Sequence, residues 1–190
     1  DASPLLVSGQ GVTGAPSAGK ISSQADLVIS IGCRLTDFTT GSQSAFNNPA
    51  VKFISINVGG HDAYKQSGVP IVADAREALV ALTQAADAAG IQPNAAYVAE
   101  AAQLSREWQA QLDAEVSEEI PGETMRQGQL VRMLNDAAQP GDTVISAAGT
   151  LPADLLKAWD ATGGRKCHLE FGYSCMGYEI PAGLGVRMTQ

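Results

Sequence analysis

The sequence predicts an α/β protein made of two doubly wound parallel-sheet domains, both incomplete within these 190 residues. Short apolar runs rich in valine and isoleucine alternate with segments of helical composition, which is the pattern of parallel sheets. A long polar, alanine-rich segment interrupts this alternation, which then starts again. Neither half has enough strands to cover its sheet edges, so we expect further chain on both sides.

The first half, residues 1–90, is expected to hold a parallel sheet with two helices. The apolar runs that predict its strands are bounded by glycine, aspartate or asparagine and lie at 5–8, 27–32, 51–57 and 69–72. Helices are expected at 16–24 and 73–89. The second of these has Asp74 at its start, and an aspartate there is a favourable N-cap.

A helical linker is expected over residues 91–122. Within it, residues 97–119 place Leu104, Trp108 and Leu112 at helical spacing. The second half, 123–190, then repeats the alternation of helix and strand. Its predicted elements are a helix at 124–138, a strand at 143–147, a helix from about 152, a strand at 166–170 and a helix at 177–188.

Composition and charge exclude several classes of protein. Hydrophobic residues make up 45% of the chain and charged residues 17%, which is typical of a globular protein. A net charge of -8 argues against nucleic-acid binding. No apolar run approaches the roughly 20 residues of a membrane-spanning helix, and the N-terminus lacks a signal pattern. We therefore expect a soluble, cytoplasmic protein without nucleic-acid or membrane partners.

The cysteines predict neither a disulfide framework nor a metal site. Cys33, Cys167 and Cys175 are odd in number and form no CxxC pair, and the chain has two histidines. We expect three reduced, mostly buried thiols and no metal ligands within this chain.

Two motifs in the first half allow both a structural and a binding role. Gly9, Gly11 and Gly14 have the GxGxxG spacing of dinucleotide sites, but the next strand ends without the acid that would hold a ribose, which favours a tight turn. Arg34 and Asp37 follow that strand. They either contact a ligand or pair with each other to brace the loop.

The string from Gly32 to Gly41, the strand at 53–57 and the segment at 69–74 together resemble the middle domain of acetolactate synthase-like thiamine diphosphate enzymes. The resemblance makes residues 1–90 the C-terminal half of that Rossmann-like domain and 123–190 the N-terminal part of the cofactor-binding domain. Some family members hold a flavin in the middle domain. Because Asn57 stands where the family strand usually ends in aspartate, a flavin or nucleotide here stays an open question.

The second half carries the sharper resemblance. A strand-to-helix turn at 148–151 offers free amides that suit a phosphate, which assigns Gly149, Thr150 and Leu151 to cofactor binding. Residues 172–185 resemble the family's G-x-x-x-M-G-x-x-[IL]-P-A-x-[IL]-G stretch. The resemblance implies that the backbone around Met176 binds the aminopyrimidine and its side chain props the bent cofactor. The cofactor-binding residues of this stretch are Ser174, Cys175 and Met176. The ligands of the Mg²⁺ that accompanies the diphosphate are expected outside these residues.

Residues 147–155 and 168–179 are most similar to a ring-opening hydrolase branch of the family that acts in inositol catabolism. Strand alternation places Lys166, His168 and Glu170 on one face, with Glu170 at the carboxyl end of the strand. Glu170 is therefore the candidate catalytic residue, or else a carboxylate that braces the loop.

The resemblance implies cleavage of a C–C bond next to a carbonyl in a small-molecule substrate, by a full-length homodimer or homotetramer. The 190 residues alone are expected to be inactive. Decarboxylation or carboligation of a 2-keto acid is the alternative within the family. A non-catalytic nucleotide-binding or regulatory module is the alternative from another class.

Overall fold

The computed structural model describes residues 3–118, 121–122, 124–170 and 172–189. In these residues the chain forms two separate parallel sheets, which confirms the predicted α/β class. The chain divides into two compact units. The N-terminal unit comprises Gln10–Val12 and Pro16–Ala101, and the C-terminal unit comprises Asp1–Gly9, Thr13–Ala15 and Ala102–Gln190. The domain boundaries proposed from the sequence stay predictions.

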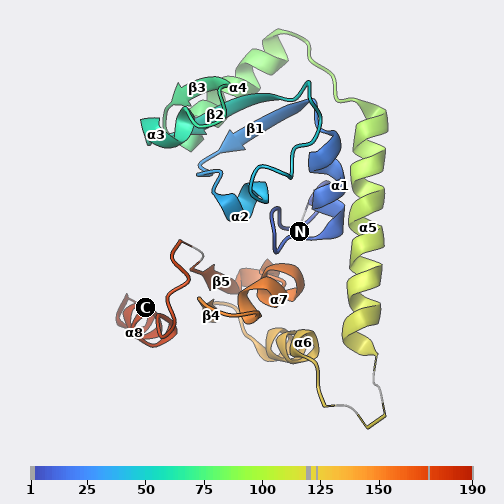
Figure 1. Ribbon diagram of the computed structural model, residues 1–190, viewed down its shortest axis with the longest axis vertical. Helices are drawn as coiled ribbons and strands as arrows, with labels where there is room; N and C mark the ends of the chain where they lie inside the picture. Colours follow the sequence, from blue (N-terminus) through green and yellow to red (C-terminus); the bar gives the residue numbers. More distant parts are fainter. Residues whose placement is uncertain (1–2, 119–120, 123, 171, 190) are drawn as a thin grey trace. The chain divides into compact units, whose positions relative to one another are not determined.

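A three-stranded sheet forms the centre of the N-terminal unit (Figure 1). Its strands β1 (Leu27–Ile31), β2 (Lys52–Asn57) and β3 (Val69–Val72) lie in sequence order, and Ile31, Ile56 and Ile71 stand side by side across them. The apolar runs at 27–32, 51–57 and 69–72 are thus confirmed as strands. A parallel sheet suits such runs because helices cover its faces.

The two helices expected at 16–24 and 73–89 are confirmed, and two short helices that were not predicted accompany them. They are α1 (Pro16–Gln24), α2 (Asp37–Thr40), α3 (Gly60–Ala63) and α4 (Ala75–Ala88). Asp74 caps α4, because its carboxylate accepts hydrogen bonds from the amides of Arg76 and Glu77. Helix α3 packs on β2 and β3, and α4 packs on β2.

The strand predicted at residues 5–8 is wrong. These residues form neither a strand nor a helix, and the Leu5 and Leu6 side chains are exposed. The Leu6 carbonyl accepts a hydrogen bond from the Ser105 hydroxyl at 2.8 Å instead of a strand partner. An apolar run becomes a strand only when a neighbouring strand satisfies its backbone groups.

The glycine motif at 9–14 makes a tight backbone crossing. Gly11 has a φ of 115°, and the amide of Val12 donates to the Phe38 carbonyl at 2.8 Å. A Cβ at Gly11 would collide with that carbonyl oxygen. The spacing of these glycines therefore has a structural cause, in agreement with the tight-turn interpretation.

A two-stranded sheet of β4 (Thr143–Ser146) and β5 (Lys166–Leu169) lies in the C-terminal unit (Figure 1). The long helix α5 (Ala95–Ser117) enters this unit at Ala102. The helix predicted at 97–119 is thus confirmed up to Ser117, although Glu119 lies outside the described residues; its role as a linker stays a prediction. The remaining helices are α6 (Gln127–Ala137), α7 (Leu151–Ala158), the short 3-10 helix η1 (Thr162–Gly164) and α8 (Glu179–Thr189).

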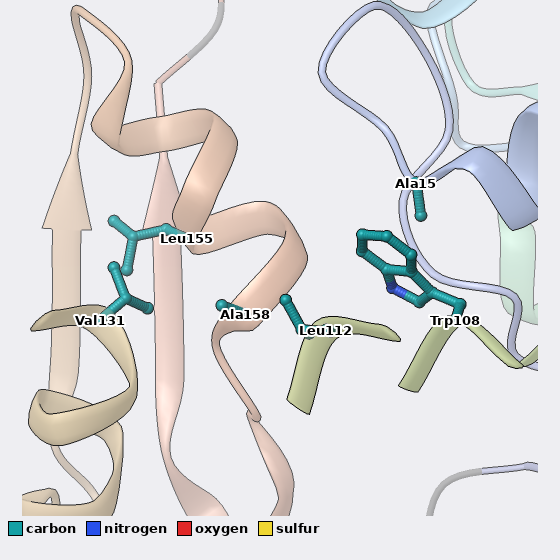
Figure 2. Packing of buried hydrophobic residues seen from close by; sticks show 6 residues of the cluster. All are labelled: Ala15, Trp108, Leu112, Val131, Leu155 and Ala158. Atoms are coloured by element: carbon teal, nitrogen blue, oxygen red, sulfur yellow. The ribbon is translucent and has the colours of Figure 1, made fainter. Parts of the chain in front are cut away.

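The core of the C-terminal unit joins α5, α6 and α7. Figure 2 shows the Trp108 indole beside Ala15, and Val131 facing Leu155. The fully buried members Val131 and Leu155 are 0% and 2% exposed. The helical spacing of Trp108 and Leu112 predicted from the sequence places both in this cluster: Ala15, Trp108, Leu112, Val131, Leu155 and Ala158.

Two further expectations concern cysteines and membranes. The three cysteines are free, but Cys167 and Cys175 are exposed and Cys33 is half-buried, so the expectation of mostly buried thiols is wrong. Cys167 lies on β5, a strand at the edge of a two-stranded sheet, where side chains stay open to solvent. In the described part of the chain, no helix is both long and apolar enough to span a bilayer.

Candidate functional site

The candidate site lies where β4 and β5 end. The strands are parallel, so their carboxyl ends meet at one edge of the sheet, where open α/β sheets bind ligands. β4 runs into the turn at 147–151, and β5 runs into the loop that leads to α8. Both predicted cofactor-binding segments are in these connections.

The turn after β4 presents backbone amides at the start of α7. Gly149 has a φ of 85° and open space around its α-carbon, so the backbone is accessible there. The Thr150 hydroxyl donates to Gln127 at 3.0 Å, which holds the turn against α6. Within the described residues, no acceptor is assigned to the amides of Gly149, Thr150 or Leu151. Free amides at a helix start suit a phosphate group.

The loop after β5 is attached to the end of β4 at Ala147. The Ser174 hydroxyl donates to the Ala147 carbonyl at 3.2 Å, and the Ala147 amide donates to the Glu179 carboxylate at 2.9 Å. The structure thus brings Ser174 beside the turn that holds Gly149–Leu151. Met176, between these two attachment points in the sequence, is 89% exposed.

Glu170 forms the contacts of a loop-bracing carboxylate. Its two oxygens accept hydrogen bonds from the amides of Tyr173 at 2.9 Å and Cys175 at 3.3 Å. The Tyr173 amide, with lesser support from the other loop amides, lowers the pKa of Glu170. The carboxylate is therefore ionised and directed at the segment that carries Cys175. A catalytic role for Glu170 stays a prediction.

Sequence reasoning missed Glu179, the first residue of α8. Its own backbone amide and then that of Ala147 lower the pKa of its carboxyl group. The signal was present, because Glu179 lies inside the family-like stretch. Its contact with a residue 32 positions away was not predictable from spacing.

A second missed feature is a pair of rings beside the loop. The His168 Nε2 atom and the Tyr178 hydroxyl are 2.8 Å apart, and the rings stack with centroids 5.6 Å apart. The sequence predicted His168 on the same strand face as Glu170. Its partner, Tyr178, comes from the end of the loop that follows β5. This pair connects β5 to the residue before α8.

The polar residues at the carboxyl ends of β1 and β2 are arranged to hold loops. No ion pair joins Arg34 to Asp37 among the described residues, so the pairing that was one of the two alternatives for them is not observed. Lys65 instead donates to the Arg34 carbonyl at 2.8 Å. The Asn57 side chain donates to the Cys33 carbonyl and accepts from the Gly59 amide. Both ends of this amide are thus occupied.

Two cavities in the C-terminal unit lie away from the candidate residues. The larger one, of about 900 Å³, is lined by the N-terminal segment, α5 and the end of α7. A cleft shared by the turn at 148–151 and by Ser174–Met176 therefore stays a prediction. In the described ranges, no group of three or more His, Cys, Asp or Glu side chains could hold a metal ion.

Comparison with known proteins identifies the family. Residues 1–82 match the thiamine pyrophosphate enzyme central domain. These residues belong to the thiamine pyrophosphate enzymes. Thiamine pyrophosphate is the cofactor also called thiamine diphosphate, so the resemblance seen in the motifs is confirmed.

Curated relatives extend the similarity to both units. The chain is 33% identical over 98% of its length to 3D-(3,5/4)-trihydroxycyclohexane-1,2-dione hydrolase 2 of Bacillus cereus. It is 35% identical over 96% of its length to 3D-(3,5/4)-trihydroxycyclohexane-1,2-dione hydrolase of Halalkalibacterium halodurans, and 32% identical over 98% to that of Bacillus anthracis. The chain spans 32% of the length of each of these relatives.

Proposed function

We propose that the full-length protein is a thiamine diphosphate-dependent enzyme that cleaves a C–C bond next to a carbonyl. We further propose that it opens the ring of 3D-(3,5/4)-trihydroxycyclohexane-1,2-dione by hydrolysis, in myo-inositol catabolism. The observation that supports this most is identity of about a third, over nearly the whole chain, to hydrolases named for that substrate. The aligned region contains both candidate segments.

The candidate residues fit the cofactor chemically. The amides of Gly149, Thr150 and Leu151 are assigned no acceptor in the described residues, and they suit the diphosphate. Ser174, Cys175 and Met176 supply backbone groups for the aminopyrimidine. The exposed thioether of Met176 is a polarisable apolar surface suited to an aromatic ring. Thiamine diphosphate, when bound, supplies the electron sink for cleavage of the C–C bond.

At this site the protein's own residues position the cofactor, its metal ion and the substrate. An ionised diphosphate brings several negative charges to a chain of net charge -8, so we propose that Mg²⁺ accompanies it, with ligands supplied by other parts of the protein. On the substrate side we propose Glu170 as the acid or base, because it lies at the carboxyl end of β5.

A substrate comparison tests the proposal. The purified full-length protein, with thiamine diphosphate and Mg²⁺, is given trihydroxycyclohexane-1,2-dione or pyruvate in parallel. We expect the dione to be consumed and an acid released, with no acetolactate formed from pyruvate. Acetolactate formation would favour the 2-keto acid alternative. Failure to bind the cofactor would favour the non-catalytic alternative.

The proposal includes the assembly and the location of the protein. We propose a homodimer or homotetramer in the cytoplasm, without nucleic-acid or membrane partners. Sedimentation of the full-length protein should show a species of two or four copies. A monomer at micromolar concentration, with full activity, would contradict the assembly.

A further inference from the structure

The backbone around Ala147 is shared by the two candidate cofactor segments. Ala147 is 0% exposed and directly precedes the turn at 148–151. Its carbonyl accepts from Ser174 and its amide donates to Glu179. The carbonyl and the amide of buried Ala147 are therefore both hydrogen-bonded to side chains of the loop and helix that follow β5. Loss of either contact would cost free energy, because a buried peptide group without a hydrogen-bond partner is destabilising.

The two contacts lie on either side of Met176 in the sequence. Ser174 precedes it by two residues, and Glu179 follows it at the start of α8. The intervening backbone includes Gly177 with a φ of 86°. A segment fixed at both ends cannot shift along β4 without breaking one of the contacts.

Ser174 adopts a backbone conformation that needs a cause. Its φ is 51°, in the left-handed region that non-glycine residues rarely occupy. Such a conformation persists where surrounding contacts determine it, and it is found most often at functional sites. Here the Ser174 hydroxyl donates to the Ala147 carbonyl, a contact that supports this conformation.

From these observations we propose that Ser174 and Glu179 are positioning residues. They dock the Ser174–Met176 backbone onto the peptide groups of Ala147 and so fix its spacing from the Gly149–Leu151 amides. This inference rests on the proposed function, since it concerns the two segments that would bind the diphosphate and the aminopyrimidine. It adds that their separation is set by two side chains that need not touch the cofactor.

Substitutions in the full-length protein separate docking from general stability. For Glu179→Ala we expect the dissociation constant for thiamine diphosphate, measured with excess Mg²⁺, to rise about tenfold, because a charge-assisted hydrogen bond is lost. Glu179→Gln keeps a neutral acceptor for the Ala147 amide and should stay within about threefold of wild type. At saturating cofactor, kcat and the substrate KM of both variants should return to within about twofold of wild type.

Ser174 offers an internal comparison. Ser174→Ala and Ser174→Gly both remove the hydroxyl, but glycine also relieves the positive φ. If the hydroxyl contact positions the loop, both variants weaken cofactor binding by similar factors. If backbone strain alone matters, the glycine variant binds at least as tightly as wild type, and the inference is overturned for Ser174. Glu115→Gln, in the exposed part of α5, is the control, since the Glu115 carboxylate accepts a hydrogen bond from Gln111 on the same helix.

Hydrogen exchange of the cofactor-free protein tests the docking contacts independently of whether the protein binds thiamine diphosphate. The peptide that covers 143–150 should exchange faster in Glu179→Ala than in wild type or Glu179→Gln. Unchanged exchange and unchanged cofactor affinity would overturn the inference. Faster exchange in a protein whose wild-type form binds no thiamine diphosphate would support the docking contact while refuting the proposed function.

Discussion

Trp108 shows how a single side chain in the core of the C-terminal unit combines burial with an unused polar group. It is 6% exposed, and its indole Nε1 has no hydrogen-bond partner among the described residues. An unpaired buried N–H costs free energy, whereas the surrounding ring buries a large apolar area. The packing of this residue, and not its polar atom, should therefore stabilise the unit.

Two substitutions at Trp108 test this. Trp108→Phe should lower the free energy of unfolding by less than about 1.5 kcal/mol, because it keeps a ring and removes an unsatisfied donor. Trp108→Ala should lower it by about 3–5 kcal/mol through the cavity that it leaves. Urea denaturation followed by far-ultraviolet circular dichroism measures both. Equal losses for the two variants would contradict the expectation that a phenyl ring can replace most of the packing of the indole.

The Glu170 carboxylate predicts an acid-sensitive loop. Loop amides, that of Tyr173 first, lower the pKa of Glu170 below the usual glutamate range. A carboxyl group with a lowered folded-state pKa contributes stability above its unfolded-state pKa, and this contribution is lost as the pH falls through the folded-state pKa. The loop should thus stay closed at neutral pH and loosen only in acid.

Amide chemical shifts of Tyr173 and Cys175 should report this titration. We expect both to move together with a midpoint below the usual glutamate range. In Glu170→Gln the shared transition should vanish. A midpoint above the usual range would mean that the carboxylate is not bound by these amides.

At the scale of elements, the apolar runs that have a parallel strand partner were predicted correctly, whereas the run at 5–8, which has none, was not. The strands near 27–31, 52–57 and 69–72 came from composition and flanking turn residues, because each has a parallel partner that suits a buried run. Residues 5–8 have similar composition but no strand partner in the described chain. Local sequence cannot supply that information, since pairing depends on residues far away.

The candidate site was predictable in part for the same reason. The motifs located the turn at 148–151 and the loop at 174–176, since both are contiguous in sequence. The contacts that join them at Ala147 depend on the packing of α8 against β4, which no spacing rule encodes. Pairing of Arg34 with Asp37, one of the two local alternatives for these residues, is not observed in the described chain, where Asp37 begins α2.

The turn at Gly11 allows a matched test of glycine placement within one unit. Gly11→Ala should destabilise the N-terminal unit by at least about 1–3 kcal/mol, the usual cost of a strained backbone, and the close Phe38 carbonyl adds to it. Gly19→Ala, in α1 with open space around it, should instead stabilise by about 0.5–1 kcal/mol. Thermal unfolding of both variants measures the contrast. Destabilisation by both would mean that α1 is packed more tightly than its open surroundings indicate.

For the molecule as a whole, charge limits what these 190 residues can bind. The net charge is -8, and no cluster of metal-binding side chains occurs in the described ranges. A helix N-terminus contributes about 1 kcal/mol towards an anion, whereas micromolar affinity requires roughly 8 kcal/mol. The amides at 149–151 therefore cannot hold a diphosphate tightly without a cation.

We accordingly expect the 190-residue chain to bind thiamine diphosphate more weakly than micromolar, even with excess Mg²⁺, and to be inactive. Isothermal titration should show no saturable heat at micromolar concentrations. The full-length protein under the same conditions is the positive control. A clear micromolar isotherm for the 190 residues would mean that they contain a metal site that we have not recognised.

The core of the C-terminal unit has a spectroscopic consequence. The chain has two tryptophans, and both Trp108 and Trp159 belong to this unit. Tryptophan emission therefore reports on the C-terminal unit alone, while circular dichroism registers the helices of both. Denaturation curves recorded by the two methods will superimpose if the units unfold together and separate if they do not. The two native tryptophans thus allow a test, without an added label, of whether the two units unfold in one cooperative transition.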